Sequence, residues 1–482
     1  MEPCAVLHIT SLHGGGVDRH VRDIARGLER AQLVWHAGDA AEVLEVAGVP
    51  RYLALDPAAV ERGADRLADF LRHARVGLVH AHSLARAARR RSALAAERLG
   101  VRTLATLHDV LFLRREGFEP GAPPEPDPAW LAETSAFLRA AAAVVAPSEY
   151  IAGLARAHVP GLEVTVIPNG TAPSAPASPG AGARAEFAAR GTKRVAAVIG
   201  AIGPHKGSAV LDELDALLAG TDIAIVVIGY LDTQVEPGWR GEHLFVHGAY
   251  READVGALLA AYGARLALFP NRVPESFSYA LSEAWEAGLP ALVPGVGALA
   301  ERVLEHGGGW VFPVDAGARE IAAALDAHLR GGGARVESGQ HRVPRIEDMT
   351  RSLDALYARF GLDAAAPVDA RAPGIQELLA RNLDGTVFRE ELARLADELA
   401  QVRAGLETER GQARRFETEA RAWIAKLEGD IAKLQAEVAV EVEARRKFAG
   451  ENAELRVNKE ALDRLPGLLR RLLLRRARDA RG

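Results

Sequence analysis

Short apolar runs typical of buried strands recur along the chain from Val6–Thr10 to Gly309–Pro313, and stretches with helical periodicity separate them. Strands that alternate with helices predict parallel sheets covered by helices. The alternation occurs twice, on either side of Thr171–Arg190, whose Pro, Ala, Gly and Ser content is typical of an interdomain linker. We therefore predict an α/β fold with two facing, doubly wound, Rossmann-like domains, one over residues 1–175 and one over residues 190–362.

The pattern changes after residue 362. A Pro- and Ala-rich linker over residues 363–387 leads into apolar residues at heptad spacing, which predict a coiled coil over residues 388–460 with one register shift after Trp423. A coiled coil favours a homo-oligomer; a single amphipathic helix folded back on the enzyme is the alternative.

The final segment, residues 461–482, places leucines and arginines at helical spacing and predicts a basic amphipathic tail. Such a helix suits an anionic membrane surface, because its apolar face enters the headgroup region and its basic face meets lipid phosphates. A nucleic-acid arm is less favoured, since aromatic residues and an adjoining basic domain are missing. A solvated chain end is a further alternative.

Composition narrows the class of protein. The chain has 482 residues and a formal net charge of −5, which does not favour a nucleic-acid partner. Cys4 is the only cysteine, so no disulfide can form within the chain, and a reducing compartment is favoured. We see neither a signal-peptide pattern nor an apolar run long enough to span a membrane. We expect a cytoplasmic protein, peripheral on the inner face of the membrane if the tail binds lipid.

Polar residues end two of the predicted strands. His80 and His82 close one apolar run, and His108 and Asp109 close the next. Open α/β sheets bind their ligands at this edge. We expect His80 and His82 to alternate in direction, so that only one of them faces the cleft. Three histidines raise the question of a metal site, but no cysteine cluster or second shell is evident, and we predict no metal.

The stretch Pro274–Pro290 carries two glutamates, Glu275 and Glu283, after the predicted strand Leu266–Pro270. It predicts a helix whose first turn lies near Phe277–Ala280. A helix N-terminus offers free backbone N–H groups and the positive end of the dipole, and so suits a phosphate. Glu275 lies just outside that end, and Glu283 lies about two turns further on, too far to touch the same phosphate. One carboxylate for each end of such an anion fits a nucleotide sugar.

Within PESFSYALSEAWEAGLP, the two glutamates resemble the Glu-x7-Glu motif of the family 4 (group 1) retaining glycosyltransferases, which have the two-domain GT-B architecture. The resemblance covers about residues 5–360, and it implies that a helix over residues 345–361 crosses back toward the first domain. It implies that Glu275 holds hydroxyls of the donor sugar and that Glu283 holds the ribose. It also implies that the backbone of Phe277, Ser278 and Tyr279 binds the diphosphate.

Segments of the first half fit the same family. The glycine loop with Gly15 and Gly16 does not satisfy the dinucleotide fingerprint, but the resemblance implies that it faces the donor phosphates. The run that ends in Asn169 and Gly170 matches the family's hinge, so both residues are expected to line the cleft. His108 matches a family histidine near the donor sugar and the acceptor.

The segment from Gly200 to Lys206 fails the P-loop spacing but resembles the family's G-R-x-x-x-x-K-G. Both residues are implied to bind the donor, with Lys206 as a point charge for the diphosphate. Ala201 stands where the family usually carries arginine, so a bidentate phosphate ligand is lost. Either His205 or Arg272 replaces it, or donor binding is weaker.

The resemblance implies a retaining, metal-independent glycosyltransferase that uses no cofactor, with Glu275, His108 and Lys206 as the catalytic residues. Its substrates would be a nucleotide-diphosphate sugar and a glycan or lipid-linked acceptor in bacterial surface polysaccharide (O-antigen, capsule or lipopolysaccharide) biosynthesis. The alternatives are an inactive GT-B-like scaffold that acts through its coiled coil, which Ala201 favours, and a sugar-nucleotide epimerase. The donor sugar, its base and the acceptor stay open.

Overall fold

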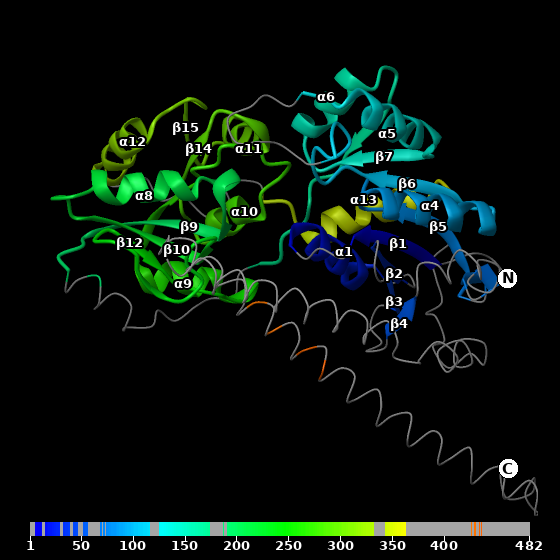
Figure 1. Cartoon of the computed structure of the whole chain (residues 1–482), viewed down its shortest axis with the longest axis horizontal. Coiled ribbons are helices and arrows are strands. Elements are labelled where there is room, and N and C mark those ends of the chain that lie inside the picture. Colours follow the sequence, from blue (N-terminus) through cyan, green and yellow to red (C-terminus); the bar gives the residue numbers. More distant parts are fainter. Residues whose placement is uncertain are drawn as a thin grey trace, which may run out of the picture.

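The computed structural model describes residues 5–362 with short gaps, and beyond residue 362 only Lys426, Gly429, Lys433 and Gln435. The gaps lie at 12–14, 29–31, 39–41, 47–51, 56–67, 70, 73, 116–124, 174–186, 188–189 and 332–342. The described part forms two α/β domains that face each other (Figure 1), as the alternation of strands and helices predicts.

The first domain is built on an eight-stranded sheet with the order β4-β3-β2-β1-β5-β6-β7-β8. Six strands run parallel: β1 (Ala5–Ser11), β2 (Gln32–Ala37), β5 (Val76–Ala81), β6 (Arg102–Thr106), β7 (Ala143–Ala146) and β8 (Val164–Val166). Two strands that the sequence pattern did not reveal, β3 (Glu42–Val46) and β4 (Tyr52–Leu55), extend one edge in antiparallel pairs. The helices are α1 (Gly16–Gly27), α4 (Arg86–Leu99), α5 (Pro128–Ala140) and α6 (Glu149–His158).

Successive side chains of each strand point to opposite faces of this sheet. On the face covered by α4, Leu7 and Val79 are fully buried in an apolar core. On the opposite face, Val6, Leu78 and Leu104 start an equally apolar layer. The same face becomes polar toward the carboxyl ends of the strands, and this change places the histidines described below.

The second domain has a seven-stranded sheet with the order β11-β12-β10-β9-β13-β14-β15. Its strands are β9 (Arg194–Ile202), β10 (Ile223–Leu231), β11 (Gly238–Trp239), β12 (Leu244–Val246), β13 (Ala264–Leu268), β14 (Ala291–Pro294) and β15 (Gly309–Phe312). All pairs are parallel except β11 with β12. Two apolar layers sandwich the sheet, one with α8 (Ser208–Leu217) and α12 (Ala318–Arg330), the other with α9 (Val255–Tyr262), α10 (Tyr279–Glu286) and α11 (Gly297–His306).

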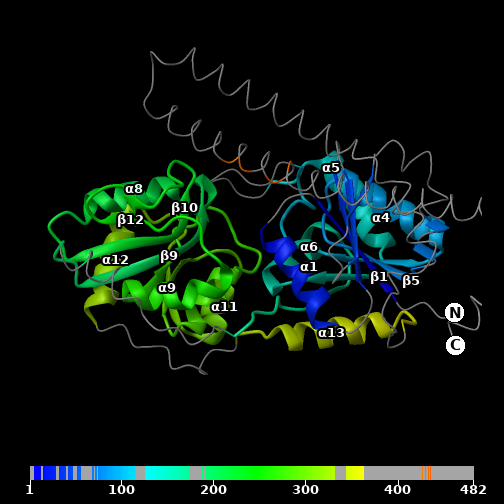
Figure 2. The same ribbon diagram turned by 90° about the horizontal axis from the view of Figure 1, so that it is seen from below.

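The last described helix, α13 (Ile346–Ala358), packs on the first domain although it follows the second in sequence (Figures 1 and 2). Its Leu353 and Tyr357 are fully buried against the first sheet. A return of residues 345–361 toward the first domain was expected from the family architecture, and the structure confirms it. Part of the core of the first domain therefore comes from a helix that follows the second domain in sequence.

The chain crosses between the domains twice, and the two crossings lie side by side. The Thr171 N–H donates to the Pro344 carbonyl at 2.8 Å. A Cβ on Gly170 would lie 2.4 Å from the Cα of Ile346, closer than real Cβ contacts come. Glycine is therefore needed where the two crossings touch.

A second set of contacts joins the domains at α6. Glu301 of α11 accepts hydrogen bonds from the backbone N–H groups of Glu149 and Tyr150. Ser148, the N-cap of α6, donates to the Ser276 carbonyl at 2.8 Å. A carboxylate at a helix N-terminus is favourable because it meets free N–H groups and the positive end of the dipole.

Three predicted segments lie outside the described residues: the linker at 363–387, the coiled coil at 388–460 (apart from four isolated helical positions) and the basic tail at 461–482. These stay predictions. Within the described part, every helix is too short or too polar to cross a membrane.

Candidate active site

A cleft of about 690 Å³ lies between the two domains, within the size range of small-molecule sites. Residues from both domains line it. They include every site residue proposed from the sequence: Gly15, Gly16, His108, Asn169, Gly200, Lys206, Glu275, Phe277, Ser278, Tyr279 and Glu283. Positions spread over most of the two domains therefore meet at one place. Gly170, next to Asn169, instead packs against the second crossing of the chain.

Glu275 lies between β13 and α10, at the sugar end of the predicted donor site. Its Oε1 accepts a hydrogen bond from Asn271 Nδ2 at 2.9 Å and lies 3.6 Å from Lys206 Nζ. Its carbonyl accepts from the N–H of Ala298, in the first turn of α11, at 2.9 Å. Gly297 has φ +70°, and a Cβ there would lie 2.9 Å from the Glu275 nitrogen. The carboxylate is thus fixed through both its side chain and its backbone.

The N-terminus of α10 opens into the cleft. Ser278 is its N-cap, with φ +70°, and the Ser278 hydroxyl accepts from the Leu281 N–H. A non-glycine residue with positive φ is uncommon and needs support from its surroundings. The remaining N–H groups of the first turn have no partner within the helix. Such free N–H groups suit an anion, which is the role that the sequence predicts for this turn.

That support comes from Arg302 of α11, a buried arginine. Its Nη1 donates to the carbonyls of Phe277 at 3.0 Å and Ser278 at 2.9 Å, and its Nη2 donates to Ser282 Oγ at 2.8 Å. The guanidinium also lies 4.2 Å from the centre of the Phe277 ring. By holding both carbonyls on the side away from the cleft, Arg302 sets the direction of the peptide groups that carry the N–H donors.

Glu283, in the second turn of α10, is buried and pairs across the cleft with Arg19 of α1 at 2.5 Å. Burial raises the pKa of the Glu283 carboxyl above its ordinary value, and the Arg19 guanidinium offsets this only in part. Arg19 also lies 4.2 Å from the centre of the Tyr279 ring and 3.5 Å from Glu252. The carboxylate predicted to bind the ribose is therefore held by a residue of the first domain.

A layer of buried imidazoles continues the cleft wall into the first domain. His8, His80, His82 and His108 come from β1, β5 and the loops after β5 and β6, and His20 comes from α1. The expectation that His80 and His82 point in opposite directions is wrong. Their ring centres lie 4.0 Å apart, because residues two apart in a strand share a face.

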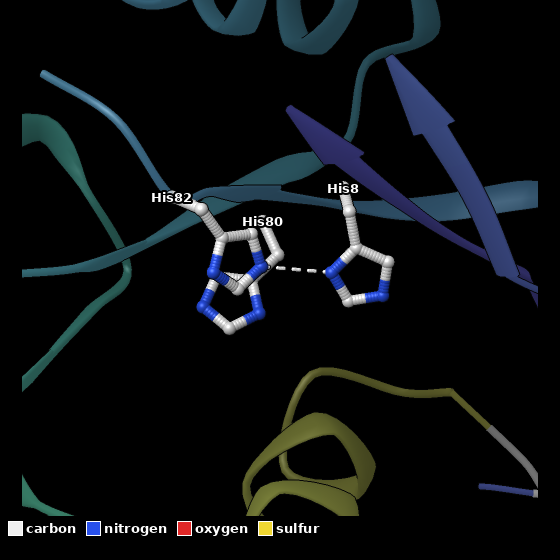
Figure 3. Close-up of side chains that lie close together, drawn as sticks. All are labelled: His8, His80 and His82. Atoms are coloured by element: carbon white, nitrogen blue, oxygen red, sulfur yellow. Dashed lines mark hydrogen bonds between the residues drawn. The ribbon is translucent and has the colours of Figure 1, made fainter. Parts of the chain in front are cut away.

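Hydrogen bonds link this layer. Gln32 Oε1 lies 2.5 Å from His8 Nε2, His8 Nδ1 lies 2.8 Å from His82 Nε2, and His82 Nδ1 lies 3.1 Å from His108 Nε2. Figure 3 shows the middle link, with His8 and His82 turned toward each other. Burial lowers the pKa of His108 to about 3, so its imidazole is neutral at physiological pH. Burial also raises the pKa of Asp109 to about 6.

Comparison with known families gives this cleft its context. A model of Glycosyltransferase Family 4 matches residues 14–174, and a model of Glycosyl transferases group 1 matches residues 182–341. The chain belongs to the family 4 (group 1) glycosyltransferases. No curated protein sequence matches the chain.

Solved structures share the fold of this glycosyltransferase. HepE from Anabaena, in complex with UDP and glucose, has a TM-score of 0.55 and 16% identity, and the match covers 74% of this chain and 100% of HepE. Sucrose-phosphate synthase from Thermosynechococcus elongatus has a TM-score of 0.54 and 17% identity, over 74% of this chain and 98% of the synthase. At such low identity the likeness shows the GT-B fold and nothing finer.

Ala201, where family 4 usually has arginine, is exposed at the end of β9. Of the two neighbours considered as substitutes, Arg272 donates its Nη1 to the Ala316 carbonyl at 3.0 Å and does not line the cleft, whereas His205 does. Burial and the adjacent Lys206 lower the pKa of His205, so it supplies little positive charge at neutral pH. Among the described residues, the Lys and Arg side chains that line the cleft are those of Lys206 and Arg19.

Sequence reasoning missed Arg19, Asn271 and Arg302. Arg19 had a usable signal, because it lies in the first turn of the helix that follows the glycine loop. Asn271 lies in the loop between β13 and Glu275. Arg302 had none, since it is one arginine in an ordinary amphipathic helix and its partners lie in another element.

Proposed function

We propose that this family 4 glycosyltransferase is a retaining enzyme that transfers a sugar from a nucleotide-diphosphate sugar to a glycan or lipid-linked acceptor. The observation that carries the proposal is that Glu275, the N-terminus of α10 and Glu283 follow one another along a single cleft. We assign them to the sugar, the diphosphate and the ribose of the donor, in that order. The fold is shared with HepE, which has been solved in complex with UDP-glucose.

The chemical task is to stabilise a departing diphosphate. The N–H groups of the first turn of α10, oriented by Arg302, and the Lys206 ammonium supply positive potential at the leaving group. Lys206 lies 3.6 Å from Glu275, so a bound diphosphate would compete with Glu275 for the Lys206 ammonium. That exchange frees Glu275 to accept hydrogen bonds from the sugar.

The ribose site requires a similar exchange. Glu283 is paired with Arg19, and binding of a ribose diol would replace this charged hydrogen-bond donor by two neutral hydroxyl donors. Arg19, which lines the same cleft, would then be free to turn toward the donor phosphates. In this way Arg19 takes over the role of the arginine that the family usually has at the position of Ala201.

In the retaining scheme of this family, the leaving phosphate accepts the proton of the attacking hydroxyl, and no side-chain nucleophile is required. Neutral His108 positions the sugar and the acceptor rather than donating a charge. The scheme needs neither a cofactor nor a metal ion for turnover. Bacterial surface polysaccharide assembly is the pathway we favour, with the coiled coil forming a homo-oligomer and the basic tail bringing the enzyme to its acceptor at an anionic membrane.

A catalytically inactive scaffold is the second candidate, and Ala201 is the observation that favours it. The test that separates the two is a thermal-shift and hydrolysis screen of the full-length chain against common nucleotide sugars, with Glu275→Ala and the surface variant Arg330→Met beside it. An enzyme is stabilised by one donor and slowly hydrolyses it, and Glu275→Ala loses hydrolysis while Arg330→Met does not. Failure of every donor to bind would favour the scaffold.

A further inference from the structure

The buried imidazoles include two groups of three whose ring nitrogens converge within 4.8 Å: His8, His80 and His82, and His20, His82 and His108. The sequence predicts no metal, in part because it shows no second shell around these histidines. In the structure that reason fails, since Gln32 accepts from His8, and Thr106 and Tyr357 contact the two nitrogens of His80.

The inner group is a poor site. Both nitrogens of His80 already have hydrogen-bond partners, Thr106 Oγ1 and Tyr357 OH, each at 2.7 Å. All three rings lie between the sheet and α13, with exposed fractions of 0 to 2% (Figure 3). An ion would have to displace existing bonds and would have no path to enter.

The outer group differs in two ways: an ion there would replace only the hydrogen bond between His82 and His108, and the site has an entry path. His20 is 2% exposed, and neither of its ring nitrogens has a hydrogen-bond partner in the structure. Buried polar atoms of this kind cost free energy and call for an explanation. His108, in turn, lines the donor cleft, which offers an entry path and an open side.

The geometry also fits. His82 Nδ1 and His108 Nε2 lie 3.1 Å apart. Two nitrogens that bind one ion at about 2.0–2.1 Å with tetrahedral angles lie about 3.3 Å apart, so the distance between these two nitrogens would change little. The nitrogens of His20 complete a triangle within 4.8 Å.

A chain of hydrogen bonds prepares His82 as a ligand. Gln32 Oε1 can only accept, so His8 carries its proton on Nε2 and accepts at Nδ1. His82 must then donate from Nε2, which leaves the lone pair of its Nδ1 directed toward His108. A ligand histidine whose second nitrogen is held in this way is typical of protein metal sites.

We propose that His20, His82 and His108 form a binding site for a divalent transition-metal ion of the zinc class, with its fourth position open to the donor cleft. Three neutral imidazoles with one open position are a known ligand set for Zn²⁺, and imidazole also suits Co²⁺, Ni²⁺ and Cu²⁺. The ion is not required for the proposed transfer reaction. It would hold His108, and so compete with the sugar for that residue.

The test uses untagged, full-length protein that has been stripped with a chelator and then titrated with Co²⁺, because Zn²⁺ itself has no visible absorption. We expect one Co²⁺ per chain with the d–d spectrum of a four-coordinate site, displaced by Zn²⁺. His20→Leu should weaken Co²⁺ binding at least tenfold. In the absence of metal this variant should be as stable as the original or more so, because the two unpaired nitrogens are gone.

Two further variants locate the ion. His158→Ala, which changes a histidine of α6 outside the imidazole layer, should bind Co²⁺ like the original protein. His80→Gln should also bind it, since His80 belongs only to the inner group. Failure of the original protein to bind Co²⁺, or undiminished binding by a folded His20→Leu, would overturn the proposal, as would binding that depends on His80 alone. None of these measurements needs a sugar donor, so their outcome is independent of the proposed enzymatic function.

Discussion

Arg302 offers the sharpest test of how the phosphate site is built. In Arg302→Met an unbranched apolar side chain replaces the guanidinium, so the carbonyls of Phe277 and Ser278 lose their donor. The first turn of α10 then loses the contact that fixes its orientation and that stabilises Ser278 at φ +70°. We expect donor binding to suffer far more than folding.

The expected change in stability is small because two large terms oppose each other. Burial lowers the pKa of the Arg302 guanidinium from 12.5 to about 9. At ~1.4 kcal/mol for each pKa unit, holding the charge in the fold costs roughly 5 kcal/mol, a penalty present at every pH below about 9. Methionine removes this penalty but leaves two carbonyls unpaired, at about 1–3 kcal/mol each. The free energy of unfolding should therefore change by less than about 3 kcal/mol.

The loss of donor affinity has no opposing term of this kind. A charge-assisted hydrogen bond from an oriented N–H to a phosphate contributes about 1.5–3 kcal/mol, and ~1.4 kcal/mol is a factor of ten in affinity. Loss of one such bond should weaken donor binding by roughly ten- to a hundredfold. Isothermal titration with the donor identified in the screen measures the affinity, and urea unfolding measures the stability.

Arg330→Met, at an exposed arginine of α12, is the matched control and should leave both quantities unchanged. If Arg302→Met lost more than about 5 kcal/mol of stability while its folded fraction bound the donor normally, the reasoning would be refuted. Arg302 would then be a structural residue with no role in orienting the N–H groups.

Three other predictions follow from features of the cleft and the chain. Burial raises the pKa of Glu283, and the ribose needs the ionised carboxylate. Donor affinity should therefore begin to fall, as the pH is lowered, at a higher pH than the pKa of an ordinary carboxyl group would give. Titration calorimetry of Glu283→Gln should show weaker binding without this pH dependence. Gly170→Ala, whose Cβ would collide with the backbone of Ile346, should lower the free energy of unfolding by about 2–4 kcal/mol in urea, and an unchanged midpoint would show that the crossings can separate freely. Removal of residues 388–482 should reduce the mass measured by light scattering to that of a monomer; an unchanged mass would place the oligomer interface elsewhere.

The site residues that could be predicted from the sequence are those that carry local signals. Glu275, Glu283 and Lys206 stand in contiguous motifs whose glycines and helix start are visible in the sequence, and all three line the cleft. Arg19 and Arg302 act through partners in other elements, and Arg19 and Glu283 are 264 positions apart in the sequence. No period or motif encodes such a pairing, so only the tertiary structure reveals it.

The histidines show a different limit. Spacing alone is sufficient to place His80 and His82 on one face, because side chains in a strand alternate with a period of two. The prediction of opposite directions is correct only for adjacent residues, and these two histidines are two positions apart. The five-ring layer itself could not be predicted, because it depends on β1, β5 and β6 being neighbours in the sheet. The β3–β4 extension was missed for a related reason: short edge strands carry little hydrophobic pattern.

The packing of α13 on the first sheet has a consequence for synthesis of the protein. A nascent chain usually folds its N-terminal domain first, while the rest is still being made. Here the surface formed by Val6 and Leu78 stays uncovered until Leu353 and Tyr357 have left the ribosome. The second domain, whose core needs no residue of the first, can finish folding earlier. The half that is translated later is thus free to become native before the half that is translated first.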